Sequence, residues 1–312
     1  MIQVLNLFKS FGRVKAVDNL SFEIQKGEII GFLGPNGAGK TTTLRLLSGF
    51  LFPDQGSIKI AGISVLENTE QAQKHIGYLA ENNPLYKDML VSEILNLSAD
   101  LKNLSKAQKL ESLDFAVNSC AISDVFYKSV SELSKGYKQR VGIATALLGQ
   151  PDIIIMDEPT EGLDPNQREE IRQLIKSLAK NMEQTIIMST HVMAEVQAVA
   201  SRILIINQGK LAADGTPDEL ALSAQAKKII ILNIQGNNLE PVLRDLAREY
   251  KAKLNIESKN LDFFKAKILL KNSQEIRPEI SKLAHKYNWT IWELREQEKK
   301  LEDVFRKLTR KK

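Results

Sequence analysis

The chain has 312 residues, of which 43% are hydrophobic, and its formal net charge at pH 7 is +5. This length suits one large domain followed by a small one, and the single cysteine, Cys120, excludes an internal disulfide and is typical of a reducing cytoplasm. The longest apolar runs are strand-sized, far short of the roughly 18 residues that span a bilayer, so a membrane pore would have to lie on another polypeptide.

Two stretches near the amino terminus predict antiparallel strands. Residues 1–30 and about 50–66 alternate apolar and polar side chains, and a turn at 53–56 separates two of the strands. The first residues begin a strand and do not have the pattern of a signal peptide. We expect these strands to form a platform at one end of the large domain.

The sequence GPNGAGKT at 34–41 fits the pattern G-x-x-x-x-G-K-[ST] of a loop that binds the phosphates of ATP or GTP. An apolar run at 28–33 predicts a buried strand before it, and residues 42–49 predict a helix that ends at a glycine. A glycine-rich turn without a ligand is the alternative, which this strand and helix disfavour. We expect Lys40 to reach the β- and γ-phosphates and the Thr41 hydroxyl to ligate Mg²⁺. The residues predicted to hold the nucleotide here are Gly34, Pro35, Asn36, Gly37, Ala38, Gly39, Lys40, Thr41 and Thr42.

A helical segment follows from about 88 to 130, because its apolar residues recur three and four positions apart. It ends at LSKGYKQR, residues 133–140, which a second helix-like run continues. Ser134 suits a helix N-cap, and on its own this is the simpler interpretation. The alternative is that Ser134 and Gly136 offer a hydroxyl and N–H groups to an anion at the helix N-terminus.

Residues 153–158 read Ile-Ile-Ile-Met-Asp-Glu, which predicts a buried strand that ends in two carboxylates. At the carboxyl edge of a sheet, Asp157 could hold Mg²⁺ through water and Glu158 could accept a proton from an attacking water. A solvated acidic turn is the alternative. Further strands are predicted at 185–190, directly before His191, and at 202–207. A lone histidine after a strand is more often structural than functional.

Beyond residue 217 the pattern becomes strand, helix, strand, strand, helix, strand, with a closing helix from Lys300 to Arg310. We predict a large domain at 1–222 and a small ferredoxin-like α+β domain at 223–312. Residues 221–312 hold 21 Lys+Arg and 12 Asp+Glu. This basic surface could face anionic lipid or nucleic acid, but its dispersed charges and lack of interleaved aromatics favour an ordinary solvated surface.

Taken in order, the phosphate loop, LSKGYKQR and the strand ending in Asp-Glu resemble the ATP-binding cassette (ABC) family, whose signature is LSGGQ-x-x-R. The resemblance covers the first 215 residues. It implies an α/β P-loop fold with a mixed core sheet, an antiparallel amino-terminal subdomain and an inserted helical lobe. It also implies that two cassettes sandwich two ATP molecules with Mg²⁺, where Ser134 and Gly136 bind the γ-phosphate held by the opposite subunit.

The resemblance assigns roles to further residues. Phe11 occupies the position that stacks on adenine, although the residues alone equally allow a core phenylalanine in an edge strand. Asp164 lies in Glu-Gly-Leu-Asp, which resembles the loop that crosses the dimer interface, with Glu161 in place of the usual serine. His191 matches the histidine that contacts the γ-phosphate, so the expected catalytic residues are Lys40, Glu158 and His191. Glu81 stands where the family has a glutamine near Mg²⁺ and the attacking water, so the expected metal-binding residues are Thr41, Asp157 and Glu81.

Three stretches narrow the resemblance: ENNPLY at 81–86, the variant signature, and EGLDPNQR at 161–168 look like ATPase subunits of ABC-2-type exporters, particularly the gliding-motility branch. This implies an ATP-hydrolysing subunit, in a homodimer or heterodimer, that drives separate polytopic membrane subunits from the cytoplasmic face of the membrane. The helical lobe and the loop at Glu81 would form the docking surface. A soluble cassette ATPase acting on ribosomes or nucleic acid is the alternative; one cassette without a heptad run disfavours it, and no nucleic-acid partner is expected.

Overall fold

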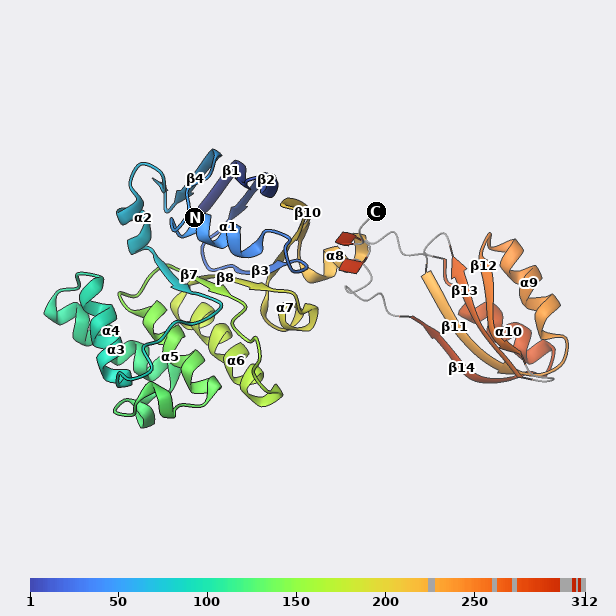
Figure 1. Cartoon of the computed structure of the whole chain (residues 1–312). Helices are drawn as coiled ribbons and strands as arrows, with labels where there is room; N and C mark the ends of the chain where they lie inside the picture. Colours follow the sequence, from blue (N-terminus) through green and yellow to red (C-terminus); the bar gives the residue numbers. More distant parts are fainter. Residues whose placement is uncertain (224–227, 260–262, 271–273, 298–304, 307, 310–312) are drawn as a thin grey trace. The chain divides into compact units, whose positions relative to one another are not determined.

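The computed structural model describes residues 1–223, 228–259, 263–270, 274–297, 305–306 and 308–309 (Figure 1). The chain divides into two compact units, one built on Met1–Leu220 and the other on Ala221–Val304. Described residues near the carboxyl terminus return to the first unit, where the carbonyl oxygen of Leu308 accepts a hydrogen bond from Asn207 Nδ2 at 2.9 Å. Among the described helices, none is both long and apolar enough to cross a membrane.

The centre of the first unit is a mixed sheet with the strand order β10-β9-β3-β8-β7-β6. Every pair in it is parallel except β9 with β10, which is antiparallel. The strands are β3 (Ile29–Leu33), β6 (Ile76–Leu79), β7 (Ile153–Asp157), β8 (Thr185–Thr190), β9 (Arg202–Asn207) and β10 (Lys210–Gly215). All residues of β3, β7 and β8 are buried, as expected for parallel strands that are covered on both faces.

A second, antiparallel sheet has the order β2-β1-β4-β5. Its strands are β1 (Ile2–Phe11), β2 (Val14–Ile24), β4 (Gln55–Ile60) and β5 (Ile63–Ser64). Helix α1 (Lys40–Leu47) lies between this sheet and the central sheet in Figure 1. One hydrophobic core joins the three layers, because Leu44 of α1, Ile2 of β1 and Ile155 of β7 belong to the same buried cluster. The predicted platform is therefore present, and the short helix α2 (Thr69–Lys74) follows it.

The opposite face of the central sheet is covered by the helical lobe (Figure 1). Its helices are α3 (Val91–Leu101), α4 (Lys106–Cys120), α5 (Lys135–Leu147), α6 (Pro165–Met182) and α7 (Met193–Val199), with 3₁₀ turns at Ser123–Val125 and Val130–Glu132. Along β7, Ile154 and Met156 pack against these helices, whereas Ile153 and Ile155 face α1. This alternation explains why the strand needs an apolar residue at every position.

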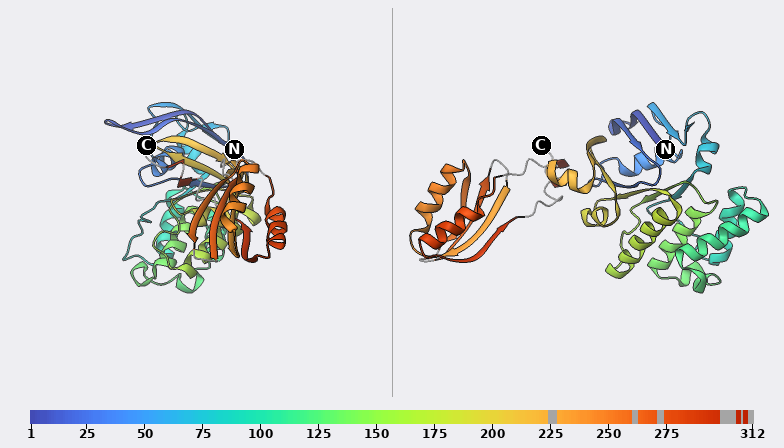
Figure 2. Two further views of the ribbon diagram at one scale, coloured as in Figure 1. Left: turned by 90° about the vertical axis from the view of Figure 1, so that its right-hand side faces the viewer. Right: turned by 180° about the vertical axis from the view of Figure 1, so that it is seen from behind.

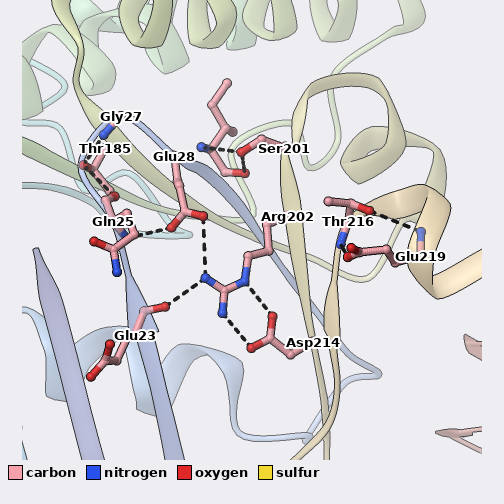
Figure 3. Close-up of polar contacts among 11 residues, drawn as sticks. Glu23, Gln25, Gly27, Glu28, Thr185, Ser201, Arg202, Asp214, Thr216 and Glu219 are labelled. Atoms are coloured by element: carbon pink, nitrogen blue, oxygen red, sulfur yellow. Dashed lines mark hydrogen bonds and ion pairs between the residues drawn. The ribbon is translucent and has the colours of Figure 1, made fainter.

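Arg202 ties the two sheets together (Figure 3). Its guanidinium holds Asp214 of β10 in two hydrogen bonds of 2.6 and 2.7 Å and donates to the carbonyl oxygen of Glu23 in β2 at 3.0 Å. Glu28 lies 3.5 Å from the same guanidinium. The hydrogen bonds that Arg202 donates to Asp214 are the largest cause that raises the pKa of Arg202 above its ordinary value. Helix α8 (Pro217–Ser223) follows this cluster, capped by Thr216 and Glu219.

The second unit has the element order predicted from the sequence and an antiparallel sheet of order β12-β13-β11-β14. Its elements are β11 (Lys228–Gln235), α9 (Leu239–Glu249), β12 (Lys253–Lys259), β13 (Phe263–Leu270), α10 (Arg277–Lys286) and β14 (Thr290–Glu296). Both helices cover one face of the sheet, which confirms the ferredoxin-like arrangement (Figure 2). Trp292 is 65% exposed on β14, an exposed aromatic that the sequence reasoning missed. The predicted helix Lys300–Arg310 lies largely outside the described residues.

Candidate functional site

The loop at 34–39 joins β3 to α1 and packs against backbone on one side only. A Cβ on Gly39, which has φ +104°, would lie 2.2 Å from the carbonyl oxygen of Ala16 in β2. Similarly, a Cβ on Gly34 would lie 2.5 Å from the carbonyl oxygen of Ile206. At Gly37, in contrast, an added Cβ would meet no atom within 4 Å. The loop is thus held firmly from behind, while its tip faces open space that a phosphate chain could fill.

Lys40 is the first residue of α1, and its side chain is only 6% exposed. Its Nζ donates to the carbonyl oxygens of Gly34 at 3.0 Å and Pro35 at 3.4 Å, and lies 3.4 Å from Oε1 of Glu158. Thr41 and Thr42 follow in the first turn of α1 and are half-buried. The ammonium group is therefore held at the mouth of the loop by a carboxylate and two carbonyls.

Asp157 ends β7, and its two carboxylate oxygens have different surroundings. Oδ1 accepts a 2.5 Å hydrogen bond from Ser189 Oγ, whereas Oδ2 is buried without a hydrogen-bond partner among the described residues. An anionic oxygen without a partner is costly to bury, and a hard cation or its water shell would satisfy it. Asp157 therefore fits the Mg²⁺-holding role predicted from the sequence.

Glu158 turns away from the strand with φ +49°, which is unusual for a residue other than glycine. Its N–H donates to Ser189 Oγ at 3.0 Å and to the carbonyl oxygen of Ser189 at 3.2 Å. His191 Nδ1 lies 3.0 Å from Oε2 of Glu158. The structure thus brings Lys40, Glu158 and His191 into one contact cluster. Sequence reasoning missed Ser189 of β8, which donates a hydrogen bond to the carboxylate of Asp157 and accepts one from the backbone N–H of Glu158.

Glu81 follows β6, and its side chain is exposed as a whole. Partial desolvation of its carboxyl group raises its pKa most, the negative charges of Asp157, Glu161 and Glu158 raise it further, and Lys40 lowers it. Glu81 therefore lies within the electric field of the same cluster. Among the described residues, no group of three or more His, Cys, Asp or Glu is arranged to hold a metal ion. Mg²⁺ is usually bound by one or two carboxylates together with substrate phosphates.

Ser134 and Asp164 are both helix N-caps in this structure. Ser134 Oγ accepts a hydrogen bond from the N–H of Tyr137 at the start of α5, and Asp164 Oδ1 accepts one from the N–H of Gln167 at the start of α6. Gly136 is buried against Gln167, which a Cβ would approach to 3.0 Å. In the described part of the chain, no hydrogen bond or ion pair joins Ser134, Gly136 or Asp164 to the cluster around Glu158. Within one subunit these residues thus belong to a separate surface.

Phe11 ends β1 beside a turn at Gly12 and is 49% exposed, so it is not a core residue. Lys9 Nζ lies 5.8 Å from the centre of its ring. The hairpin that carries Phe11 continues into β2, whose Ala16 contacts Gly39 of the phosphate loop. An exposed ring on the hairpin that packs against the phosphate loop suits stacking on a nucleotide base.

Comparison with known proteins agrees with this geometry. The model of the family described as ABC transporter matches residues 17–161, and a model of an AAA domain, described as a putative AbiEii toxin of a type IV toxin–antitoxin system, matches residues 127–196. The bacitracin transport ATP-binding protein BcrA of Bacillus licheniformis is 36% identical over 242 residues, which cover 74% of this chain and 78% of that protein. The Nod factor export ATP-binding protein I of Cupriavidus metallidurans is 34% identical over 264 residues, which cover 85% of this chain and 86% of that protein.

Solved structures are similar as well. The dimeric structure of MJ0796, a bacterial ABC transporter cassette, superposes with a TM-score of 0.63 at 26% identity and covers 69% of this chain and 98% of that one. A dimeric post-hydrolysis state of the same cassette, bound to ADP and Pi, gives a TM-score of 0.62 at 26% identity and the same coverage.

Proposed function

Since the chain belongs to the ABC transporter family, as a subunit that hydrolyses ATP, we propose that it powers an exporter of the ABC-2 type. In this proposal it is one of two paired cassettes that attach to separate membrane subunits. The observation that carries this proposal is the contact cluster of Lys40, Glu158 and His191, next in the chain to Asp157, whose Oδ2 has no hydrogen-bond partner among the described residues. Export is further supported by the printed names of two relatives, one of bacitracin transport and one of Nod factor export.

In the proposed mechanism, the phosphate loop binds the triphosphate of ATP. The Lys40 ammonium group then leaves the Glu158 carboxylate and contacts the β- and γ-phosphates. This exchange frees the Glu158 carboxylate to accept a proton from the attacking water while His191 holds its orientation. The residues that would hold Mg²⁺ are Thr41, Asp157 and Glu81. When bound, the ion neutralises charge that develops on the transferred phosphoryl group. Phe11 stacks on the base.

The second half of each site comes from the partner cassette in this proposal. Ser134 is exposed at the N-terminus of α5, and Asp164 is exposed at the N-terminus of α6. Helix N-termini attract phosphate because their first N–H groups point outward. Lys135 stands where the ABC signature has glycine, and its Nζ would lie 2.1 Å from a Cβ on Gly162, so the two loops lie against each other. We propose that this joined surface meets the γ-phosphate of the opposite subunit, in a homodimer or a heterodimer.

Docking to a membrane subunit is supported by a groove of about 820 Å³ between the platform side and the helical lobe. Phe50 and Leu101, which are 64% and 74% exposed, lie on its walls, together with Tyr78 and Lys102. A concavity with exposed apolar side chains among polar ones suits a short amphipathic helix of a partner protein. The proposed location is therefore the cytoplasmic face of a membrane. We also propose residues 1–222 as the cassette and 223–312 as an accessory domain. The boundary between the two compact units, at Leu220 and Ala221, supports this division, although the described residues near the carboxyl terminus belong to the first unit.

The proposal is tested with Glu158→Gln, which keeps the shape of the side chain but loses the charge that activates water. With MgATP this variant should accumulate as a dimer in gel filtration, because ATP stays bound between the cassettes. A tagged chain should co-purify in detergent with a polytopic membrane protein. Co-purification with ribosomes or nucleic acid, together with a monomeric variant at high protein concentration, would contradict it.

A further inference from the structure

The sheet of the second unit has one face that points away from both helices of that unit (Figure 2). Along β13 every second residue is buried, and Phe264, Ala266 and Ile268 lie in the core formed with α9 and α10. Successive residues of a strand point to opposite faces, so the residues between these three lie on the other side, which we call the open face. Its charged residues, placed by the strand register and by their ion pairs, are Lys253, Glu257, Lys265, Lys267, Glu293 and Arg295.

Two of the basic side chains on the open face are paired with carboxylates. Lys267 Nζ lies 2.5 Å from Oε1 of Glu257, and Arg295 Nε donates to Oε1 of Glu293 at 2.6 Å. The two pairs flank Ile231 of β11, whose register partners are Lys267 and Arg295. The centre of the open face is therefore polar, with its charges balanced.

Lys253 and Lys265 add positive charge that the open face does not balance. In the part of the chain that the structure describes, neither lysine has an ion pair within 4.0 Å. Lys253 is exposed on the edge strand β12, and Lys265 is half-buried on β13. The described residues thus give this face an excess of positive charge.

A β-bulge places an aromatic ring beside these charges. The register between β11 and β14 shifts between Asn233 and Ile234, which leaves Trp292 as the extra residue of β14. Such bulges redirect a side chain. The Trp292 Nε1 donates to Oε1 of Gln235 at 3.2 Å, and Gln235 lies on the open face opposite Phe263. The sequence alone disfavours a lipid contact because the basic residues lack interleaved aromatics, whereas the fold brings one to them.

We propose that the open face of the second unit binds the surface of an anionic bilayer. Lys253 and Lys265 meet lipid phosphates, and each basic residue near such a surface favours binding. Trp292, which is 65% exposed, has the amphipathic ring that prefers the level of the headgroups. The ammonium groups of phosphatidylethanolamine are partners for Glu257 and Glu293. This inference rests on the proposed function only for the membrane that the chain meets.

A single-stranded nucleic acid is the other polyanion that a basic sheet face could bind, and the open face fits it less well. Successive bases stack on successive aromatic side chains. Among the described residues of this face, Trp292 is mostly exposed whereas Phe263 is half-buried. A nucleic acid also brings no cation to Glu257 and Glu293, which repel its phosphates. The observations therefore favour lipid.

The test is cosedimentation of the full chain with vesicles, without nucleotide and without any membrane subunit. Vesicles of phosphatidylethanolamine and phosphatidylglycerol should bind the chain, and vesicles of phosphatidylcholine should bind it much less. The double variant Lys253→Gln, Lys265→Gln should bind about tenfold to thirtyfold more weakly, because each lysine contributes about fivefold. The matched control is Lys282→Gln, Lys286→Gln, which removes the same charge from exposed positions of α10 on the other face. It should change binding by less than about twofold, since distant exposed charges are screened.

Tryptophan fluorescence reports the contact directly. The chain has two tryptophans, of which Trp289 is 7% exposed and Trp292 is 65% exposed. Binding to the anionic vesicles should shift the emission to shorter wavelength, because Trp292 leaves water. Trp292→Phe should abolish the shift and weaken binding by about twofold to tenfold, on the scale of one aromatic contact. An unchanged emission of Trp289 and an unchanged melting temperature show that this variant is folded.

Three results would overturn the inference: no binding to anionic vesicles, equal binding by the double variant of Lys253 and Lys265, or an emission that does not shift. Binding of single-stranded nucleic acid in place of vesicles would also overturn it, as would a nucleotide-free dimer that Trp292→Phe dissociates, because the face would then belong to another partner. None of these results bears on the nucleotide site, which the MgATP-dependent dimer of Glu158→Gln tests separately.

Discussion

The buried contact between Lys40 and Glu158 predicts that one substitution has opposite effects on two measured quantities. The two side chains are 6% and 9% exposed, and Nζ lies 3.4 Å from Oε1. Glu158→Gln removes the negative charge but keeps the size of the side chain, which leaves Lys40 with the carbonyl oxygens of Gly34 and Pro35. We expect lower stability without nucleotide and a larger stabilisation by nucleotide.

The size of the first effect follows from the geometry. Two unit charges at this separation attract by about 5 kcal/mol at an effective dielectric constant of about 20. Breaking a buried pair costs about 3–5 kcal/mol when the remaining charge has no other partner. Because Lys40 keeps two carbonyl acceptors, we expect a loss of about 1–3 kcal/mol, which lowers the melting temperature by about 3–9 °C for a unit of this size.

The second effect follows because the phosphates must replace Glu158 as the partner of Lys40 in the wild-type protein. Separating Lys40 from Glu158 then offsets part of the favourable free energy of nucleotide binding. In Glu158→Gln there is no ion pair to separate, so this unfavourable contribution is absent. Affinity for ADP should rise about fivefold or more, since each 1.4 kcal/mol is about tenfold.

Scanning calorimetry with and without ADP, in the absence of divalent cations, measures both quantities. Glu161→Gln is the matched control: Glu161 is exposed, and its carboxylate has no ion pair within 4.0 Å in the described structure. It should change neither quantity by a comparable amount. A Glu158→Gln variant with the melting temperature and the ADP shift of the wild type would refute the reasoning.

Three further outcomes follow. Lys40→Ala should lower the ATPase rate by at least about a hundredfold, because it removes the charge that stabilises phosphoryl transfer, and near-normal turnover would remove Lys40 from the catalytic residues. The pKa of Glu81 is raised in the folded protein, so the stability that its protonated carboxyl group contributes is lost as pH rises through that pKa. Glu81→Gln should therefore melt like the wild type well below pH 4.5 and at a higher temperature than the wild type at pH 7, and it should alter the Mg²⁺ dependence of hydrolysis. A lower melting temperature than that of the wild type at pH 7 would contradict this. Arg202→Ala should cost about 2–3 kcal/mol in chemical denaturation, since it breaks charge-assisted hydrogen bonds to Asp214 and Glu23, whereas the exposed pair partner Arg248→Ala should cost about 0–1 kcal/mol.

The sequence predicts the elements of this site well because each lies on a short contiguous pattern. The loop at 34–41 and the strand ending at Asp157 have local spacing that only a few structures satisfy, and the structure places both at the same edge of one sheet. The alternation in the last third of the chain likewise predicts the order of strands and helices in the second unit. Patterns of this kind report local geometry, and the parallel sheet then brings the strand ends together.

What the sequence does not predict are contacts between distant residues. Ser189 is an ordinary residue in a buried strand until the sheet places its hydroxyl between the carboxylate of Asp157 and the N–H of Glu158. Asn83 and Gly142 likewise give no signal along the chain, although they pack so closely that a Cβ at Gly142 would lie 2.3 Å from Asn83 Oδ1. Such pairs depend on the packing of whole elements, which no local period encodes.

The charges around the phosphate loop indicate how Glu81 affects the binding of metal and nucleotide. The negative charges of Asp157, Glu158 and Glu161 act on Glu81 there, and the positive charge of Lys40 opposes them. A triphosphate entering this field alone would be repelled by the carboxylates, whereas a triphosphate with Mg²⁺ satisfies Asp157 Oδ2 and offsets the charge of Glu81. A carboxylate at 81, where ABC ATPases have an amide, therefore strengthens the requirement that metal and nucleotide bind together.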